Sequence, residues 1–169
     1  MKVFPLSLPA VLHQRAGPDA QRHWFSVGNA ALLNEPLLGL IASRECPGKL
    51  LVETLDRVPQ WVKEGRVILS GFHAPLEQQV LRSVLRRKGR VVKLLARGLT
   101  DYQVPPEERD AFAERRMLVL TACPPGTRRT TRATALQRNW LVLALATDRV
   151  VPFAAPGSPL ACLAAEFAG

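Results

Sequence analysis

The sequence predicts an α/β protein with a three-layer, doubly wound, mainly parallel sheet of five strands and helices on both faces. Short apolar runs alternate along the chain with segments whose apolar residues recur at helical spacing. This rhythm is typical of parallel βαβ units that are joined by right-handed crossovers. The chain has 169 residues, of which 47% are hydrophobic, and this suffices for one domain with a sizeable core.

The first predicted strand lies in the stretch from Leu37 to Lys49, which reads L-L-G-L-I-A-S-R-E-C-P-G-K. Its nearly continuous apolar residues predict a strand that is buried on both faces. A short polar turn with Pro47 and Gly48 follows, and then a segment of helical spacing that Pro59 kinks or breaks and Gly65 ends. We therefore expect a helix N-terminus that faces a ligand at this point.

The rest of the chain alternates between strands and helices in the same way. The pattern predicts further strands at residues 66–70, 91–96, 117–122 and 149–153. It predicts helices from Pro75 to about Gly89, over 106–115, after a cap at Thr131, and over 158–167. Ligands of such sheets bind beyond the carboxyl ends of the strands, where the strand order reverses. The loop after each strand is therefore a candidate site.

Residues 1–36 are predicted to form an N-terminal arm and lead-in, and residues 37–169 the α/β domain. Residues 10–15 and 30–34 are expected to make short helical turns, and 24–27 is a short apolar run. No apolar run reaches the roughly 18 residues that a membrane span requires. The N-terminus lacks a convincing signal-peptide cleavage site, and the three cysteines form no C-x-x-C pair. A cytoplasmic protein without a disulfide framework is expected.

The chain is strongly basic, with 23 Lys and Arg against 14 Asp and Glu and a net charge of +9. Most of the cations are Arg, whose planar group binds phosphate bidentately, so a polyanionic partner is predicted. The alternative is a basic composition without clustering. Ser43, Arg44, Gly48 and Lys49 combine a hydroxyl, two cations and the free amides of a helix start, which predicts an anion cradle. A tight turn with solvated charges is the alternative here.

A second group of cations surrounds the loop after the fourth predicted strand: Arg128, Arg129, Arg132 and Arg138. We expect this loop to lie beside the turn of residues 43–49. There its arginines would track a nucleic-acid backbone in a salt-sensitive, sequence-independent way; a solvated loop is the alternative. The cations at residues 82–90 end a helix at the opposite edge of the sheet and are assigned to solubility.

Five short motifs, in order, resemble the Rossmann-like domain of the DNA-processing protein A (DprA, Smf) family. They are Phe25-Ser26-Val27-Gly28-Asn29, Ile41-Ala42-Ser43-Arg44, Leu69-Ser70-Gly71, Thr121-Ala122-Cys123-Pro124-Pro125-Gly126 and Gln137-Arg138-Asn139. The family shows G-N, G-S-R, S-G-x-A-R-G, F-P-P-G and R-R-N-R at these places. The resemblance adds Ser70, Gly71, Gly126 and Asn139 to the phosphate- or nucleic-acid-binding candidates. It implies binding of single-stranded DNA as a homodimer and loading of a recombinase during DNA uptake.

The chain also departs from the family pattern. Ala42 stands in place of the first Gly of G-S-R, and the loop from Ser70 to Glu77 lacks the arginine of S-G-x-A-R-G. The wider superfamily includes LOG nucleotide phosphoribohydrolases, but their P-G-G-x-G-T motif and catalytic Glu are not matched at Pro156-Gly157-Ser158.

Three functions therefore stay open. The favoured one is a non-enzymatic module that binds single-stranded nucleic acid or a nucleotide phosphate. The alternatives are a LOG-like phosphoribohydrolase and a partner-binding module whose ligand site has decayed. No catalytic residue, cofactor or metal site is predicted.

Overall fold

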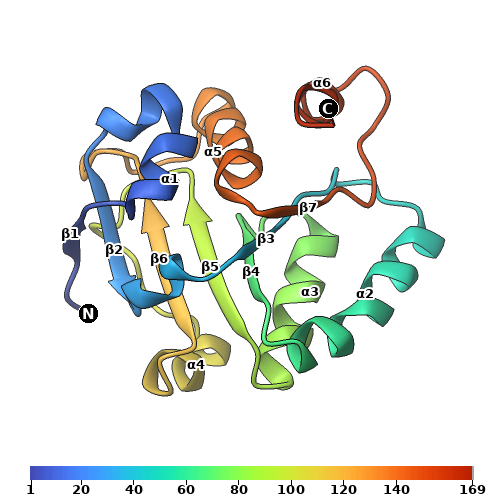
Figure 1. Ribbon diagram of the computed structural model, residues 1–169, viewed down its shortest axis with the longest axis horizontal. Coiled ribbons are helices and arrows are strands. Elements are labelled where there is room, and N and C mark those ends of the chain that lie inside the picture. The colour runs from blue at the N-terminus through green and yellow to red at the C-terminus, as the bar shows by residue number, and fades with distance from the viewer. Residues whose placement is uncertain (169) are drawn as a thin grey trace.

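The computed structural model describes residues 1–168, which form one mixed sheet of seven strands. The strands are β1 (Phe4–Leu6), β2 (Trp24–Gly28), β3 (Leu37–Leu40), β4 (Val67–Ser70), β5 (Arg90–Leu95), β6 (Met117–Thr121) and β7 (Asp148–Val150). They lie in the order β1-β2-β6-β5-β4-β3-β7 (Figure 1). All neighbours from β6 to β7 are parallel. The predicted α/β sheet is confirmed, and its five expected strands are the parallel ones.

The prediction of five strands is nevertheless wrong, because β1 and β2 extend the sheet beyond β6. Both are antiparallel to their neighbours, with Phe4 opposite Ser26 and Phe25 opposite Thr121. The two strands have three and five residues, and no crossover helix links them to the parallel series. Short antiparallel strands of this kind produce no strand–helix rhythm, so the alternation that revealed the other five did not reveal them.

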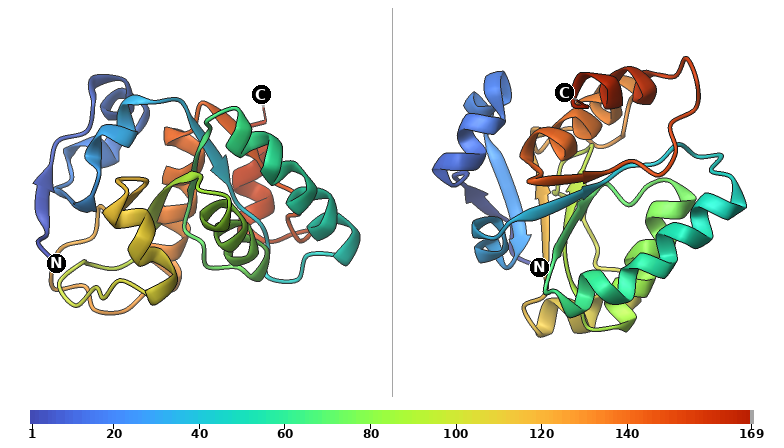
Figure 2. Two further views of the ribbon diagram at one scale, coloured as in Figure 1. Left: turned by 90° about the horizontal axis from the view of Figure 1, so that it is seen from below. Right: turned by 45° about the vertical axis from the view of Figure 1, so that its right-hand side comes forward.

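Helices cover both faces of the sheet (Figure 2). One face carries α1 (Ala10–Arg15), α5 (Arg132–Leu145) and α6 (Pro159–Glu166); the other carries α2 (Gly48–Lys63), α3 (Pro75–Arg86) and α4 (Arg109–Ala113). Short 3-10 turns lie at η1 (Gly17–Gln21), η2 (Ala30–Asn34) and η3 (Pro106–Glu108). Helix α2 continues through Pro59. Among the described residues, no helix is both long and apolar enough to cross a bilayer.

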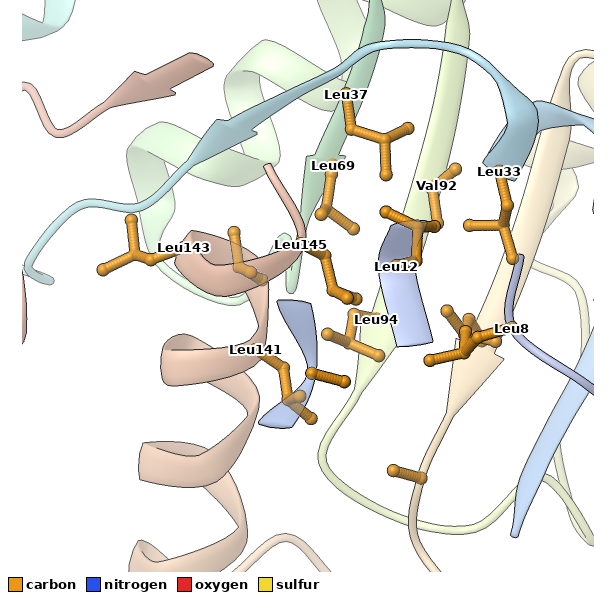
Figure 3. Packing of buried hydrophobic residues seen from close by; sticks show 14 of the residues in the cluster. Leu8, Leu12, Leu33, Leu37, Leu69, Val92, Leu94, Leu141, Leu143 and Leu145 are labelled. Carbon is orange, nitrogen blue, oxygen red and sulfur yellow. The ribbon is translucent and has the colours of Figure 1, made fainter. Parts of the chain in front are cut away.

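Strand β3 is buried along its whole length, as the apolar run predicts. Leu37 packs into the cluster under α5, whereas Leu38 and Leu40 pack into the cluster under α2 and α3 (Figure 3 shows the first cluster). Gly39 lies directly under α5, where a Cβ atom would come within 2.7 Å of the Cβ of Ala146. The absence of a side chain at Gly39 therefore lets α5 lie close against β3.

The strand order reverses at β3. The series β3-β4-β5-β6 runs outward in one direction, and β7, which follows β6 in the chain, pairs on the other side of β3. Helix α5 makes this return across the sheet. The reversal places the start of α5 near the carboxyl ends of β3 and β4, which is where doubly wound sheets bind ligands.

Candidate phosphate and nucleic-acid site

A pocket of about 340 Å³ opens at the carboxyl ends of β3 and β4. It is lined by Ala42, Ser43, Arg44, His73, Ala74, Glu77, Arg132, Ala135, Leu136, Arg138, Asn139, Ser158, Pro159 and Leu160. Larger hollows of about 460 and 500 Å³ lie beside β1 and next to α6, but neither is lined by a buried charged side chain. The pocket at β3 and β4 contains two such side chains, Arg138 and Glu77.

Arg138 projects from the second turn of α5 and is only 8% exposed. Its Nε donates a hydrogen bond to Oδ1 of Asn139 at 3.3 Å, while its two terminal nitrogens make no hydrogen bond to any described residue. The side chain crosses Gly71, where a Cβ atom would lie 2.6 Å from Nε and 2.8 Å from Cζ. Burial lowers the pKa of Arg138 and the charge of Glu77 opposes this, but a guanidinium keeps its proton at neutral pH.

Glu77 is the other buried charge, with 4% exposure, and it links two loops. Its Oε2 accepts a hydrogen bond from the amide of Ala42 at 2.9 Å; its Oε1 accepts from His73 at 3.0 Å and from Ala74 at 3.4 Å. Burial raises the pKa of Glu77, while the three amides and Arg138 act in the opposite direction. The carboxylate thus ties the turn after β3 to the start of α3.

The sequence interpretation did not include Glu77 in the site. The available signal was its position: Pro75 begins α3, so Glu77 is the third helical residue, where an acidic side chain often accepts a hydrogen bond from the N-cap amide. That signal predicts the bond to Ala74. It does not predict the bond to Ala42, because the partner lies 35 residues away on another loop.

The hydroxyl groups of the two predicted serines accept hydrogen bonds from backbone amides. Ser43 lines the pocket, but its Oγ accepts a hydrogen bond from the amide of Ala155 at 2.8 Å. Ser70 is fully buried, and its Oγ accepts from the amide of Phe72 at 3.1 Å. Both hydroxyls therefore shape the loops around the pocket, and Ser70 does not line it.

The structure gathers only some of the predicted residues. Ser43, Arg44, Arg138 and Asn139 line the pocket together with Arg132, which the sequence also placed in the basic group. The predicted residues Gly48, Lys49, Gly71, Gly126, Arg128 and Arg129 do not line it.

Those outlying residues lie on exposed surfaces or serve as packing positions. Gly48 begins α2, and Lys49 is highly exposed, with its Nζ 3.9 Å from Oε1 of Glu53. The loop after β6 was expected to lie beside the turn of residues 43–49. The part of this loop around Gly126 does not, because β5 and β4 separate β6 from β3. That loop packs on the loop after β5 instead, where the amide of Gly98 donates to the carbonyl oxygen of Thr127 at 2.8 Å.

Comparison with known proteins places the chain in a family. A family model described as DNA recombination-mediator protein A matches residues 5–164. The chain belongs to the DNA recombination-mediator protein A family. The resemblance that the five motifs indicate is thereby confirmed. A search of curated proteins found no match.

Two solved structures of DNA processing protein A (DprA) share the fold of this family member. The protein from Streptococcus pneumoniae is 21% identical, with a TM-score of 0.76; the match covers 99% of this chain and 59% of that protein. The protein from Helicobacter pylori is 22% identical, with a TM-score of 0.77, and the match covers 99% of this chain and 78% of that protein. The chain thus spans little more than half of the first relative. The second structure is described as showing a unique single-stranded DNA binding mode of that protein.

Proposed function

We propose that this chain is a DNA-processing module that binds the phosphate groups of single-stranded nucleic acid, or of a nucleotide, in the pocket at β3 and β4. One observation carries the proposal: Arg138 is 92% buried, and its two terminal guanidinium nitrogens make no hydrogen bond to any described residue. Most of the Arg138 side chain is buried, but its two terminal nitrogens are not among the buried side-chain atoms that lack a hydrogen-bond partner, so a ligand in the pocket can reach them. A phosphate oxygen pair matches the free edge of a guanidinium in charge and in geometry.

The rest of the pocket supports a nucleotide unit. Arg44 and Arg132 are exposed at its rim and add positive charge, which attracts a polyanion over a longer range. Ala135, Leu136 and Leu160 form an apolar wall, against which a sugar or a base can pack. The volume of about 340 Å³ lies at the small end of the range of small-molecule pockets, about 300–1,000 Å³. The pocket is therefore proposed to hold one nucleotide of a strand.

Family membership and the single-stranded DNA binding of the Helicobacter pylori relative support the same choice of partner. The phosphoribohydrolase alternative receives no support from Glu77. Both carboxylate oxygens of Glu77 accept backbone hydrogen bonds, which assigns the group the role of a structural acceptor that joins two loops.

The decisive test replaces Arg138 by Ala and measures binding of a fluorescently labelled oligo-dT by anisotropy. Loss of the guanidinium contacts should weaken binding by about 1.5–3 kcal/mol, or roughly 10- to 100-fold. Arg86→Ala is the matched control, because Arg86 ends α3 at the opposite edge of the sheet and should leave the affinity unchanged. Equal binding by the Arg138→Ala variant and the unmodified protein would contradict the proposal.

Two further arms of this experiment separate the remaining possibilities. The double variant Arg128→Ala with Arg129→Ala tests whether the exposed loop tracks the backbone; if each arginine contacts a phosphate, the slope of log affinity against log salt falls by about 1.4 in total. Incubation of the protein with nucleoside monophosphates tests the hydrolase alternative. Release of free base would replace the binding proposal by that enzyme activity.

A further inference from the structure

Three backbone amide groups at this edge of the sheet are already occupied by a carboxylate of the chain itself. The amides of Ala42, His73 and Ala74 come from two loops and converge on the carboxylate of Glu77 at 2.9–3.4 Å. Two of them belong to the segment that opens α3, a helix of 12 residues. Convergent amides at a helix start are an arrangement that binds phosphate in other proteins. We call the amides of Ala42, His73 and Ala74 the amide nest. The carboxylate of Glu77, an anion of the chain itself, occupies it.

We propose that Glu77 acts as an internal anion that occupies the amide nest. It thereby makes the pocket selective for ligands whose phosphate groups are not linked directly to a second phosphate. Such ligands are the phosphodiesters of a nucleic-acid strand and nucleoside monophosphates, as opposed to nucleoside diphosphates and triphosphates. This inference rests on the proposed function, because it assumes that a phosphate binds to Arg138.

The selectivity follows from two anion-binding elements in one pocket. Arg138 and the amide nest both line it. Of these two elements only Arg138 has free donors, while Arg44 and Arg132 lie exposed at the rim. A diphosphate whose first group binds Arg138 would bring its second group toward a carboxylate that is 96% buried. Like charges repel more strongly near a buried carboxylate than in bulk water, so this second phosphate is disfavoured. A phosphodiester presents one charge to Arg138 and continues as sugar toward the apolar wall.

A purely structural role for Glu77 makes a different prediction. If Glu77 only braces the two loops, its removal lowers stability, and added anions do not restore it. If the amides form an anion nest, removal of the carboxylate leaves three free donors, which a small anion can occupy. Binding of that anion to the folded state alone then raises the melting temperature.

The first experiment compares Glu77→Ala with Glu77→Gln in chloride, acetate and phosphate at equal ionic strength. Glu77→Ala leaves space for an anion, whereas Glu77→Gln fills that space and serves as the matched control. Relative to chloride, acetate and phosphate should raise the melting temperature of Glu77→Ala. This rise should be several degrees larger than the rise for Glu77→Gln or for the unmodified protein. Equal melting-temperature shifts in all three proteins would overturn the amide nest. This arm needs no nucleotide binding, so it stays informative if the proposed function fails.

The second experiment measures the affinities of dAMP and dADP by calorimetry. The unmodified protein should bind dAMP at least as tightly as dADP, and Glu77→Ala should improve the affinity for dADP relative to dAMP by at least tenfold. A preference of the unmodified protein for dADP would overturn the selectivity, and this result does not depend on whether the variant folds. Absence of binding by both nucleotides and by oligo-dT would overturn the proposed function and the selectivity with it.

Discussion

Gly71 offers a way to move the guanidinium of Arg138 without removing its charge. A Cβ atom at Gly71 would lie 2.6–2.8 Å from Nε, Cδ and Cζ of Arg138, whereas ordinary contacts begin at 3.4 Å. Gly71→Ala must therefore push the side chain by at least 0.8 Å, the difference between 3.4 Å and the shortest of these distances. The atoms that must move belong to a flexible side chain and none to the backbone.

This geometry predicts a small cost in stability and a large cost in binding. An Arg138 side chain displaced from its rotamer costs about 0.5–1.5 kcal/mol, so the variant should fold. A guanidinium that no longer meets the proposed phosphate loses a hydrogen bond to a charged group, worth about 1.5–3 kcal/mol. The affinity for oligo-dT should thus fall roughly 10- to 100-fold, while the free energy of unfolding in urea changes much less.

The control is a double-mutant cycle with Arg138→Ala. Once the arginine side chain is gone, the added methyl group of Gly71→Ala meets none of its three nearest atoms, so it should cause no further loss of affinity. Anisotropy titrations on the four proteins measure the coupling. The reasoning is refuted if Gly71→Ala binds oligo-dT as well as the unmodified protein, or if it weakens the Arg138→Ala variant by the same factor.

Two predictions concern the fold that carries the site. Gly39→Ala should destabilise the protein by about 1–3 kcal/mol in urea unfolding, because its Cβ would lie 2.7 Å from the Cβ of Ala146 and 3.0 Å from the carbonyl oxygen of Val142; an unchanged midpoint would show that α5 can shift. Arg90 donates to both oxygens of Glu35 at 2.6 Å, and this hydrogen bonding lowers the pKa of the carboxyl. A lowered acid pKa stabilises the fold above the ordinary Glu pKa, and this stability is lost as the pH falls through the lowered value. Because the pair is partly exposed, Glu35→Gln should cost less than about 1 kcal/mol at pH 7. The difference from the unmodified protein should vanish in acid, and a difference that persists there would contradict the role of the charge.

The sequence predicted the parallel part of the fold well because periodicity is a local signal. The strand at Leu37–Leu40 and the helix capped by Thr131 both follow from residues within one segment. Strand β2 is different: Phe25 pairs with Thr121, almost a hundred residues away, and nothing in its own five residues indicates that partner. The expectation that the loop after β6 lies beside the turn of residues 43–49 also depended on non-local information, because β5 and β4 stand between β6 and β3 in the sheet.

The site shows the same division between residue type and placement. Residue type placed Arg138 in the predicted basic group, and the family resemblance added Asn139. Whether Arg138 is solvated or buried depends on two glycines elsewhere in the chain. Gly39 lets α5 lie against β3, and Gly71 lets the guanidinium cross the loop after β4. In the sequence, the first reads as an interruption of an apolar run and the second as an ordinary turn residue. Together they set the position of Arg138, so a substitution at either glycine should affect phosphate binding although neither residue lines the pocket.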